Sequence, residues 1–162
     1  MIYILTGAVQ TGKSTAISKW IQGKNTVVGI LSMVNAKGTR DFINIRNQEN
    51  FSMHGHKTDS SSDVIQVGKF TFSKLAFEKA NSVIAEESQK TDYQYLVVDE
   101  LGKLELKKEG LYASTINLIK PFENSPTKHL ILVIRDYLLH EIVNEYRIKT
   151  YQTLDKSQLY TI

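Results

Sequence analysis

The sequence has 162 residues, of which 41% are hydrophobic and 23% charged, and its formal net charge is +3 at pH 7. This length predicts one domain, residues 1–162, able to bury roughly two-thirds of its unfolded surface without disulfides or metals. Because the chain has no cysteine, it cannot be a disulfide scaffold. The start of the chain has no signal-peptide pattern and no apolar run approaches the length of a membrane span, so we expect a cytoplasmic protein with no membrane partner.

The positive charges are scattered along the chain, and the notable local cluster consists of Lys103, Lys107 and Lys108. A nucleic-acid-binding surface would show a basic stripe, so nucleic acid is not a favoured partner. A protein that holds a small polyanion also needs positive charge. The excess therefore agrees with anionic ligands in general.

The chain begins with an apolar run, Ile2–Thr6, which predicts a short strand buried on both faces. Lys13–Gln22 then shows the periodicity of a helix, and Gly23 lies where helices commonly end. The loop between them fits the pattern G-x-x-x-x-G-K-[ST] in full, in the strand-to-helix context that this pattern requires. Its residues are Gly7, Ala8, Val9, Gln10, Thr11, Gly12, Lys13 and Ser14, and Thr15 follows.

Each residue type in this loop has a physical role toward phosphate. Gly7 and Gly12 let the backbone turn its N–H groups inward and form an anion-binding nest. The helix that follows points its unpaired N–H groups at the same space. Lys13 is predicted to neutralise the β- and γ-phosphates of a nucleotide, and Ser14 to coordinate Mg²⁺. A chance match in a chain of this length is on the order of one per cent, so a turn without a ligand is the weaker interpretation.

The next stretch predicts an antiparallel extension of the sheet. Val27–Met33 and Asp41–Arg46 read as strands that flank a polar turn, and a third strand, Phe51–Met53, follows. Residues 54–63 are polar and predict a surface loop. It contains His54 and His56, but no third ligand lies at suitable spacing, so no metal site is predicted there.

A strand bent at Gly68 is predicted over Val64–Phe72. Ser73 is the expected N-cap of a helix that runs to about Gln89 and directs Leu75 toward the core.

Two adjacent carboxylates end the next apolar strand, Tyr95–Glu100. Beside a phosphate loop, such a strand places its aspartate near the bound metal, so Asp99 is the predicted metal ligand. Because neighbouring strand residues point in opposite directions, Glu100 is free to orient or deprotonate the attacking water. Lys103 and Glu105 are candidates for a second layer around the phosphates or are ordinary surface charges.

The last third of the chain contains a further buried strand, Leu130–Ile134, that ends at Arg135. An arginine at this point faces the crevice where open α/β sheets bind ligands, so Arg135 can sense the γ-phosphate or stabilise the transition state. Local pairing with Asp136 or Glu141 is an equal alternative. The other expected elements are a helix from about Lys108 to Ile119 that stops before Pro121, a helix Tyr137–Tyr146, a strand Lys149–Leu154 and an edge at Leu159–Ile162.

Four stretches together resemble the thermophilic/cancer-related nucleoside-triphosphatase family of P-loop proteins. They are the phosphate loop, the hairpin from Val28 to Phe42, the stretch from Val67 to Glu78, and Val97–Leu106. The resemblance spans nearly the whole chain, and the box from Asp99 to Leu106 is its most specific part. The sequence departs from the family pattern at 8–11, inside the phosphate loop, and at 134–135, where a Thr-Ile-His-like run is expected.

This resemblance implies an α/β P-loop NTPase with a RecA-like three-layer fold, whose mainly parallel central sheet is extended by an antiparallel hairpin. It places the strand Leu130–Ile134 between the phosphate-loop strand and the Asp99 strand. It also implies Mg²⁺-dependent hydrolysis of nucleoside 5′-triphosphates, ATP and GTP among them, with broad base tolerance. By position, Gly7–Thr15 bind phosphates, Asp99 lies by the metal and Glu100 is the catalytic carboxylate.

Two other functions stay open, a small-molecule or nucleotide kinase and a nucleotide-dependent switch protein. No guanine-specificity motif of the N-K-x-D type occurs. The sequence leaves open the physiological nucleotide and pathway, any protein partner, and whether an arginine in cis or from a partner completes the site. We expect a monomer.

Overall fold

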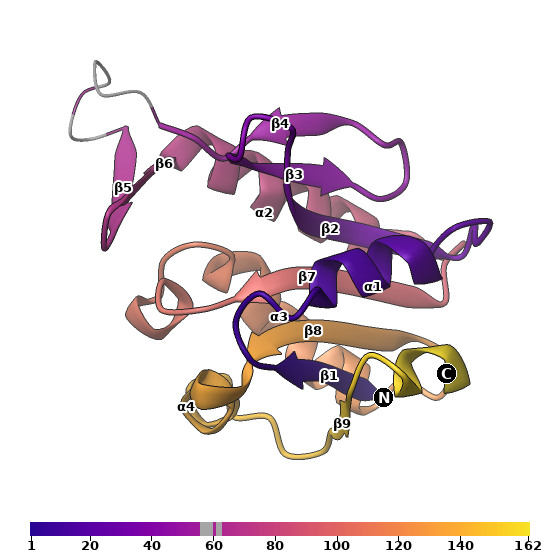
Figure 1. Cartoon of the computed structure of the whole chain (residues 1–162). Coiled ribbons are helices and arrows are strands. Elements are labelled where there is room, and N and C mark those ends of the chain that lie inside the picture. Colours follow the sequence, from indigo (N-terminus) through magenta and orange to yellow (C-terminus); the bar gives the residue numbers. More distant parts are fainter. Residues whose placement is uncertain (56–59, 61–62) are drawn as a thin grey trace.

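The computed structural model describes residues 1–55, 60 and 63–162, so His56 of the predicted loop lies outside the described residues. A seven-stranded sheet runs through the molecule with the strand order β4-β3-β2-β7-β8-β1-β9 (Figure 1). Its strands are β1 (Ile2–Gly7), β2 (Val27–Val34), β3 (Arg40–Asn44), β4 (Asn50–Ser52), β7 (Tyr95–Leu101), β8 (His129–Arg135) and β9 (Gln152–Leu154). A separate two-stranded sheet consists of β5 (Val64–Val67) and β6 (Phe70–Ser73). The helices are α1 (Lys13–Trp20), α2 (Lys74–Gln89), α3 (Tyr112–Glu123) and α4 (Leu139–Glu145), with short 3₁₀ segments at Glu105–Lys107, Asp136–Leu138 and Gln158–Thr161.

The five neighbouring strands β2, β7, β8, β1 and β9 are parallel to one another. Beyond β2, the strands β3 and β4 extend the sheet by antiparallel pairing. β8 lies between β1 and β7, which confirms the expected strand order. Because the carboxyl ends of parallel strands meet at one edge, the loop after β1 and the acidic end of β7 share that edge. Where β1 pairs with β8, Gly7 lies opposite Arg135, so Arg135 is at this edge too.

Helices cover both faces of the sheet and make the three-layer arrangement that was predicted. Along β8, Leu130 and Leu132 pack into the core beneath α2 and α3, whereas Ile131 and Val133 pack into the core beneath α1. This alternation explains why the parallel strands are continuously apolar, since both of their faces are buried. No helix in the described part of the chain is both long and apolar enough to cross a membrane.

Several sequence-based boundaries need correction. The predicted bent strand over 64–72 is a hairpin, because Gly68 adopts a positive φ of 59° and Val67 pairs back to Phe70. The Ser73 N-cap is confirmed, since its side chain accepts a hydrogen bond from the Ala76 N–H. Leu75 is 70% exposed instead of lying in the core, because the core-facing positions of the first turn of α2 are Ala76 and Phe77.

The C-terminal half also differs from prediction. α3 begins at Tyr112 and contains Pro121 in its last turn, where Phe122 is buried and holds the end of the helix against the sheet. The predicted helix 137–146 starts as a 3₁₀ turn and becomes α-helical at Leu139. The final segment is a 3₁₀ turn rather than an edge strand, because Leu159 is fully buried beneath α1.

Candidate active site

The phosphate loop joins β1 to α1 at the carboxyl edge of the sheet. Gly12 adopts the left-handed conformation (φ 78°, ψ 30°) directly before α1, which a side chain at this position would strain. Residues 8–12 are exposed, so the loop is open to a ligand. In a loop of this kind, backbone amides and the first turn of the following helix form a cradle for phosphate.

Lys13 folds back along this loop. Its ammonium donates hydrogen bonds to the carbonyl oxygens of Gly7 (2.8 Å) and Ala8 (2.9 Å), and the residue is only 5% exposed. Thr11 Oγ1 also donates to the Ala8 carbonyl, and Lys156 Nζ donates to the Thr11 carbonyl from the C-terminal segment. The cation is therefore held at the loop by neutral carbonyls, which anionic phosphate oxygens can replace.

Asp99 lies near the carboxyl end of β7 and is completely buried. One carboxylate oxygen, Oδ2, accepts a hydrogen bond from the Ser32 backbone N–H at 3.0 Å, whereas Oδ1 has no hydrogen-bond partner within the described residues. Burial raises the pKa of Asp99 to about 7, and repulsion from Glu100 acts in the same direction. The Ser14 hydroxyl and the Ser32 N–H oppose this rise in pKa.

The surroundings of Asp99 fit a divalent cation. A buried carboxylate oxygen without a partner, close to the Ser14 hydroxyl, costs free energy unless a positive group satisfies it. Carboxylate and hydroxyl oxygens are the ligands that Mg²⁺ prefers. The two residues predicted as metal ligands are thus brought together by the fold, from opposite sides of β8.

Glu100 is paired with Arg135. Arg135 Nε donates to Glu100 Oε1 at 2.7 Å, and Nη2 approaches the same oxygen at 2.5 Å. Arg135 Nη1 also lies 3.5 Å from the Tyr137 hydroxyl. The sequence offered Asp136 or Glu141 as partners and missed Glu100, because only the placement of β8 beside β7 brings the two side chains together. The peptide bond between Asp99 and Glu100 is cis.

Glu105 does not face the phosphate loop. Its carboxylate accepts hydrogen bonds from the N–H groups of Gly102 (2.6 Å) and Leu111 (2.8 Å), and the residue is 2% exposed. Burial raises its pKa, and the two backbone hydrogen bonds oppose the shift. The carboxylate therefore fixes the segment after β7, whereas Lys103 is exposed to solvent.

A further arginine, which no residue pattern had singled out, lies at the same edge. Arg40 begins β3, and its Nη1 donates to Ser32 Oγ at 3.0 Å. Its positive charge opposes the rise in the pKa of Asp99 that burial causes. In the sequence, Arg40 ends the polar turn of the predicted hairpin, within the stretch from Val28 to Phe42 that contributes to the family resemblance, but no role was predicted for it.

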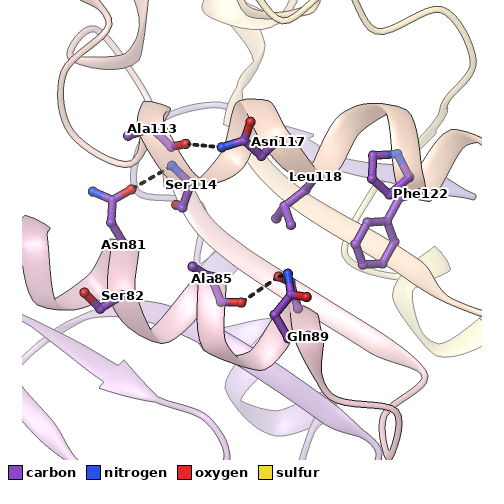
Figure 2. Close-up of a pocket in the computed structure, with 11 residues that line it drawn as sticks. Asn81, Ser82, Ala85, Gln89, Ala113, Ser114, Asn117, Leu118 and Phe122 are labelled. Carbon is purple, nitrogen blue, oxygen red and sulfur yellow. Dashed lines mark hydrogen bonds between the residues drawn. The ribbon is translucent and has the colours of Figure 1, made fainter.

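A groove with a cavity volume of about 770 Å³ lies between α2 and α3, away from this edge (Figure 2). Small and amide side chains line it, among them Asn81, Ser114 and Asn117, and Figure 2 shows the hydrogen bond from the Ser114 N–H to Asn81. All of its lining residues are described, and none of them is titratable. The groove thus lacks groups for catalysis, and the phosphate-loop edge is the candidate active site.

Comparisons with known proteins bear on the family and the fold of the chain. The model of the family described as NTPase matches residues 2–158. THEP1 from the hyperthermophile Aquifex aeolicus superposes with a TM-score of 0.69 and 21% identity, over 96% of this chain and 89% of that one. A human cancer-related nucleoside triphosphatase superposes with a TM-score of 0.66 and 18% identity, over 98% of this chain and 92% of that one. No curated protein matches the sequence significantly.

Proposed function

The chain belongs to the NTPase family, and from this premise we propose that it hydrolyses nucleoside 5′-triphosphates to diphosphate and inorganic phosphate, with Mg²⁺ and broad tolerance of the base. The observation that carries the proposal is the meeting of three groups at one edge of the sheet. They are the buried Lys13 ammonium in its loop, the buried carboxylate of Asp99 with one oxygen unpartnered, and Glu100 beside it.

The loop and Lys13 would bind the β- and γ-phosphates. On binding, the ammonium exchanges its two neutral carbonyl partners for anionic phosphate oxygens, which adds the attraction between opposite charges. The loop amides, which are already oriented, add hydrogen bonds without further reorganisation. This part of the site accounts for binding of both triphosphate and diphosphate.

Ser14 and Asp99 would hold Mg²⁺, which would supply positive charge to neutralise the negative charge that develops on the phosphate oxygens. The unpartnered Oδ1 of Asp99 supports this role. The Ser32 N–H on Oδ2 keeps the carboxylate oriented. With its pKa near 7 in the protein alone, Asp99 must be ionised to act as a ligand.

Glu100 would orient the attacking water. The water oxygen forms a bond to the γ-phosphorus as the bond from that phosphorus to the β,γ-bridging oxygen breaks. The products are diphosphate, inorganic phosphate and one proton, which leaves through Glu100 to solvent. Arg135 acts on this carboxylate directly, because both of its contacting nitrogens approach Glu100 Oε1. As a catalytic residue, it would turn toward the γ-phosphate and release Glu100 for the water.

The proposal is tested by phosphate release from ATP, GTP, CTP and UTP, with and without Mg²⁺. We expect slow release from all four, loss of release and weaker nucleotide binding in Lys13→Ala, and loss of release with intact binding in Glu100→Gln. Glu109→Gln is the matched control, since Glu109 is an exposed carboxylate to which the proposed mechanism gives no role. Equal loss of binding in the Lys13 and Glu100 variants would contradict this division of roles.

A kinase would instead consume nucleotide faster when its acceptor is added, and a switch would bind tightly with negligible turnover. The proposal also includes a single domain, a monomeric state and a cytoplasmic location. Sedimentation of the purified chain with and without nucleotide tests the oligomeric state.

A further inference from the structure

We propose that Arg40 is a second arginine, in addition to Arg135, that is supplied in cis, contacts the γ-phosphate and takes up the negative charge that develops during phosphoryl transfer. The inference rests on the proposed function and adds a residue to its site. Two observations support it: the position of Arg40 in the sheet and the contacts of its guanidinium.

Strand directions bring Arg40 to the catalytic edge. β2 runs parallel to β7, so its carboxyl end, with Ser32, lies at the same edge as Asp99. β3 runs antiparallel to β2, so it starts at that edge, where Arg40 pairs with Val34. A side chain at the start of β3 therefore approaches the acidic end of β7 from the side opposite to β8.

A short chain of hydrogen bonds links Arg40 to the metal-binding carboxylate. Arg40 Nη1 donates to Ser32 Oγ at 3.0 Å, and the backbone N–H of Ser32 donates to Asp99 Oδ2 at 3.0 Å. Ser32 is 3% exposed, so this link is buried. The guanidinium is thus held beside Asp99 without pairing with it.

Arg40 keeps donors available for an anion. A guanidinium has five N–H groups, and among the residues that the structure describes a single one of them finds a partner, the neutral hydroxyl of Ser32. The adjacent carboxylate, Asp41, is turned away and accepts from Asn35 Nδ2 at 2.9 Å. A partly buried arginine without a carboxylate partner is costly unless it serves an anionic ligand.

The other three arginines of the chain are held in ion pairs or exposed. Arg46 pairs with Glu87 and Asp92, and Arg135 pairs with Glu100. Arg147 is exposed after α4. Within the described residues, Arg40 is accordingly the arginine that lies at the catalytic edge and forms no ion pair.

The turn before β3 holds Arg40 in position. Asn35 Oδ1 accepts hydrogen bonds from the N–H groups of Lys37 and Thr39, and Asn35 Nδ2 donates to Thr39 Oγ1. The backbone carbonyl of Arg40 accepts from the Met53 N–H. Such a built turn lowers the entropic cost of placing the guanidinium at a phosphate, which is what transition-state stabilisation requires.

The experiment compares Arg40→Ala and Arg40→Gln with the control Arg147→Ala in the full chain. Three quantities are measured: phosphate release in a single turnover, the dissociation constant of ADP, and binding of ADP with aluminium fluoride, which mimics the transferring phosphoryl group. We expect both Arg40 variants to slow phosphate release about 10³-fold, as loss of such an arginine does elsewhere. They should keep the ADP affinity of the wild type and lose the tight ADP–aluminium fluoride complex, and millimolar guanidinium should partly restore release in Arg40→Ala.

Arg40→Gln decides the question if Arg40→Ala does not fold, because glutamine removes the charge but keeps a polar side chain with an N–H donor. Arg40 variants that retain phosphate release and the aluminium fluoride complex would overturn the inference, and so would an equal loss of ADP affinity. The proposed function is judged separately by the wild type, since absence of phosphate release there refutes hydrolysis whatever Arg40 does.

Discussion

Glu105 offers a direct test of whether its carboxylate is structural or belongs to the phosphate site. Replacing it with alanine removes the acceptor for two N–H groups, that of Leu111, which is buried, and that of Gly102, which is partly buried. A buried N–H left without a partner costs about 1–3 kcal/mol, and water can reach the second one more easily. Removing the buried side-chain methylenes adds about 1 kcal/mol to the loss. The variant no longer has to bury a carboxylate, and the desolvation cost that it avoids partly offsets this loss.

We therefore expect Glu105→Ala to lower the free energy of unfolding by about 3 kcal/mol, or the melting temperature by roughly 6–12 °C for a chain of this size. Glu105→Gln should also destabilise, because an amide supplies one acceptor and places its NH₂ group against the second N–H. Urea unfolding measures both effects, with Glu109→Ala as the exposed control. If Glu105→Ala unfolds at the wild-type urea concentration yet loses phosphate release, the structural role is wrong and Glu105 acts in the phosphate layer.

Two further predictions concern the sheet. Gly29→Ala should lower the free energy of unfolding by at least about 4 kcal/mol or prevent folding, because φ at Gly29 is +113° and an added Cβ would lie 2.1 Å from the carbonyl oxygen of Val97. Soluble yield and urea unfolding measure this effect, and a variant of near-wild-type stability would contradict it. Burial lowers the pKa of His129 below its usual 6.5, so the unfolded chain binds this proton more readily and stability should fall as pH drops below about 6.5. His129→Asn should reduce the difference in unfolding free energy between pH 8 and pH 5, whereas the exposed His140→Asn should not; equal pH dependence in both variants would refute the assignment.

Much of the fold was predictable because it follows from local patterns. The continuous apolar character of β1, β7 and β8 reflects burial on both faces, which depends on hydrophobicity alone. The middle position of β8 came from the family resemblance, and the strand pairing confirms it. The hairpin at Gly68 and the course of α3 through Pro121 were not predictable, because tertiary packing outweighed local propensity there.

The sequence by itself predicted where a nucleotide would bind. The phosphate loop and the pair Asp99-Glu100 are contiguous motifs whose chemistry depends on residue type and local backbone. Only the tertiary structure decided which charges surround them. Arg135 meets Glu100, and Arg40 approaches Asp99 through Ser32, because strands far apart in the sequence end at the same edge. Such contacts join residues that no local spacing relates, so they follow from the strand order and register rather than from any motif.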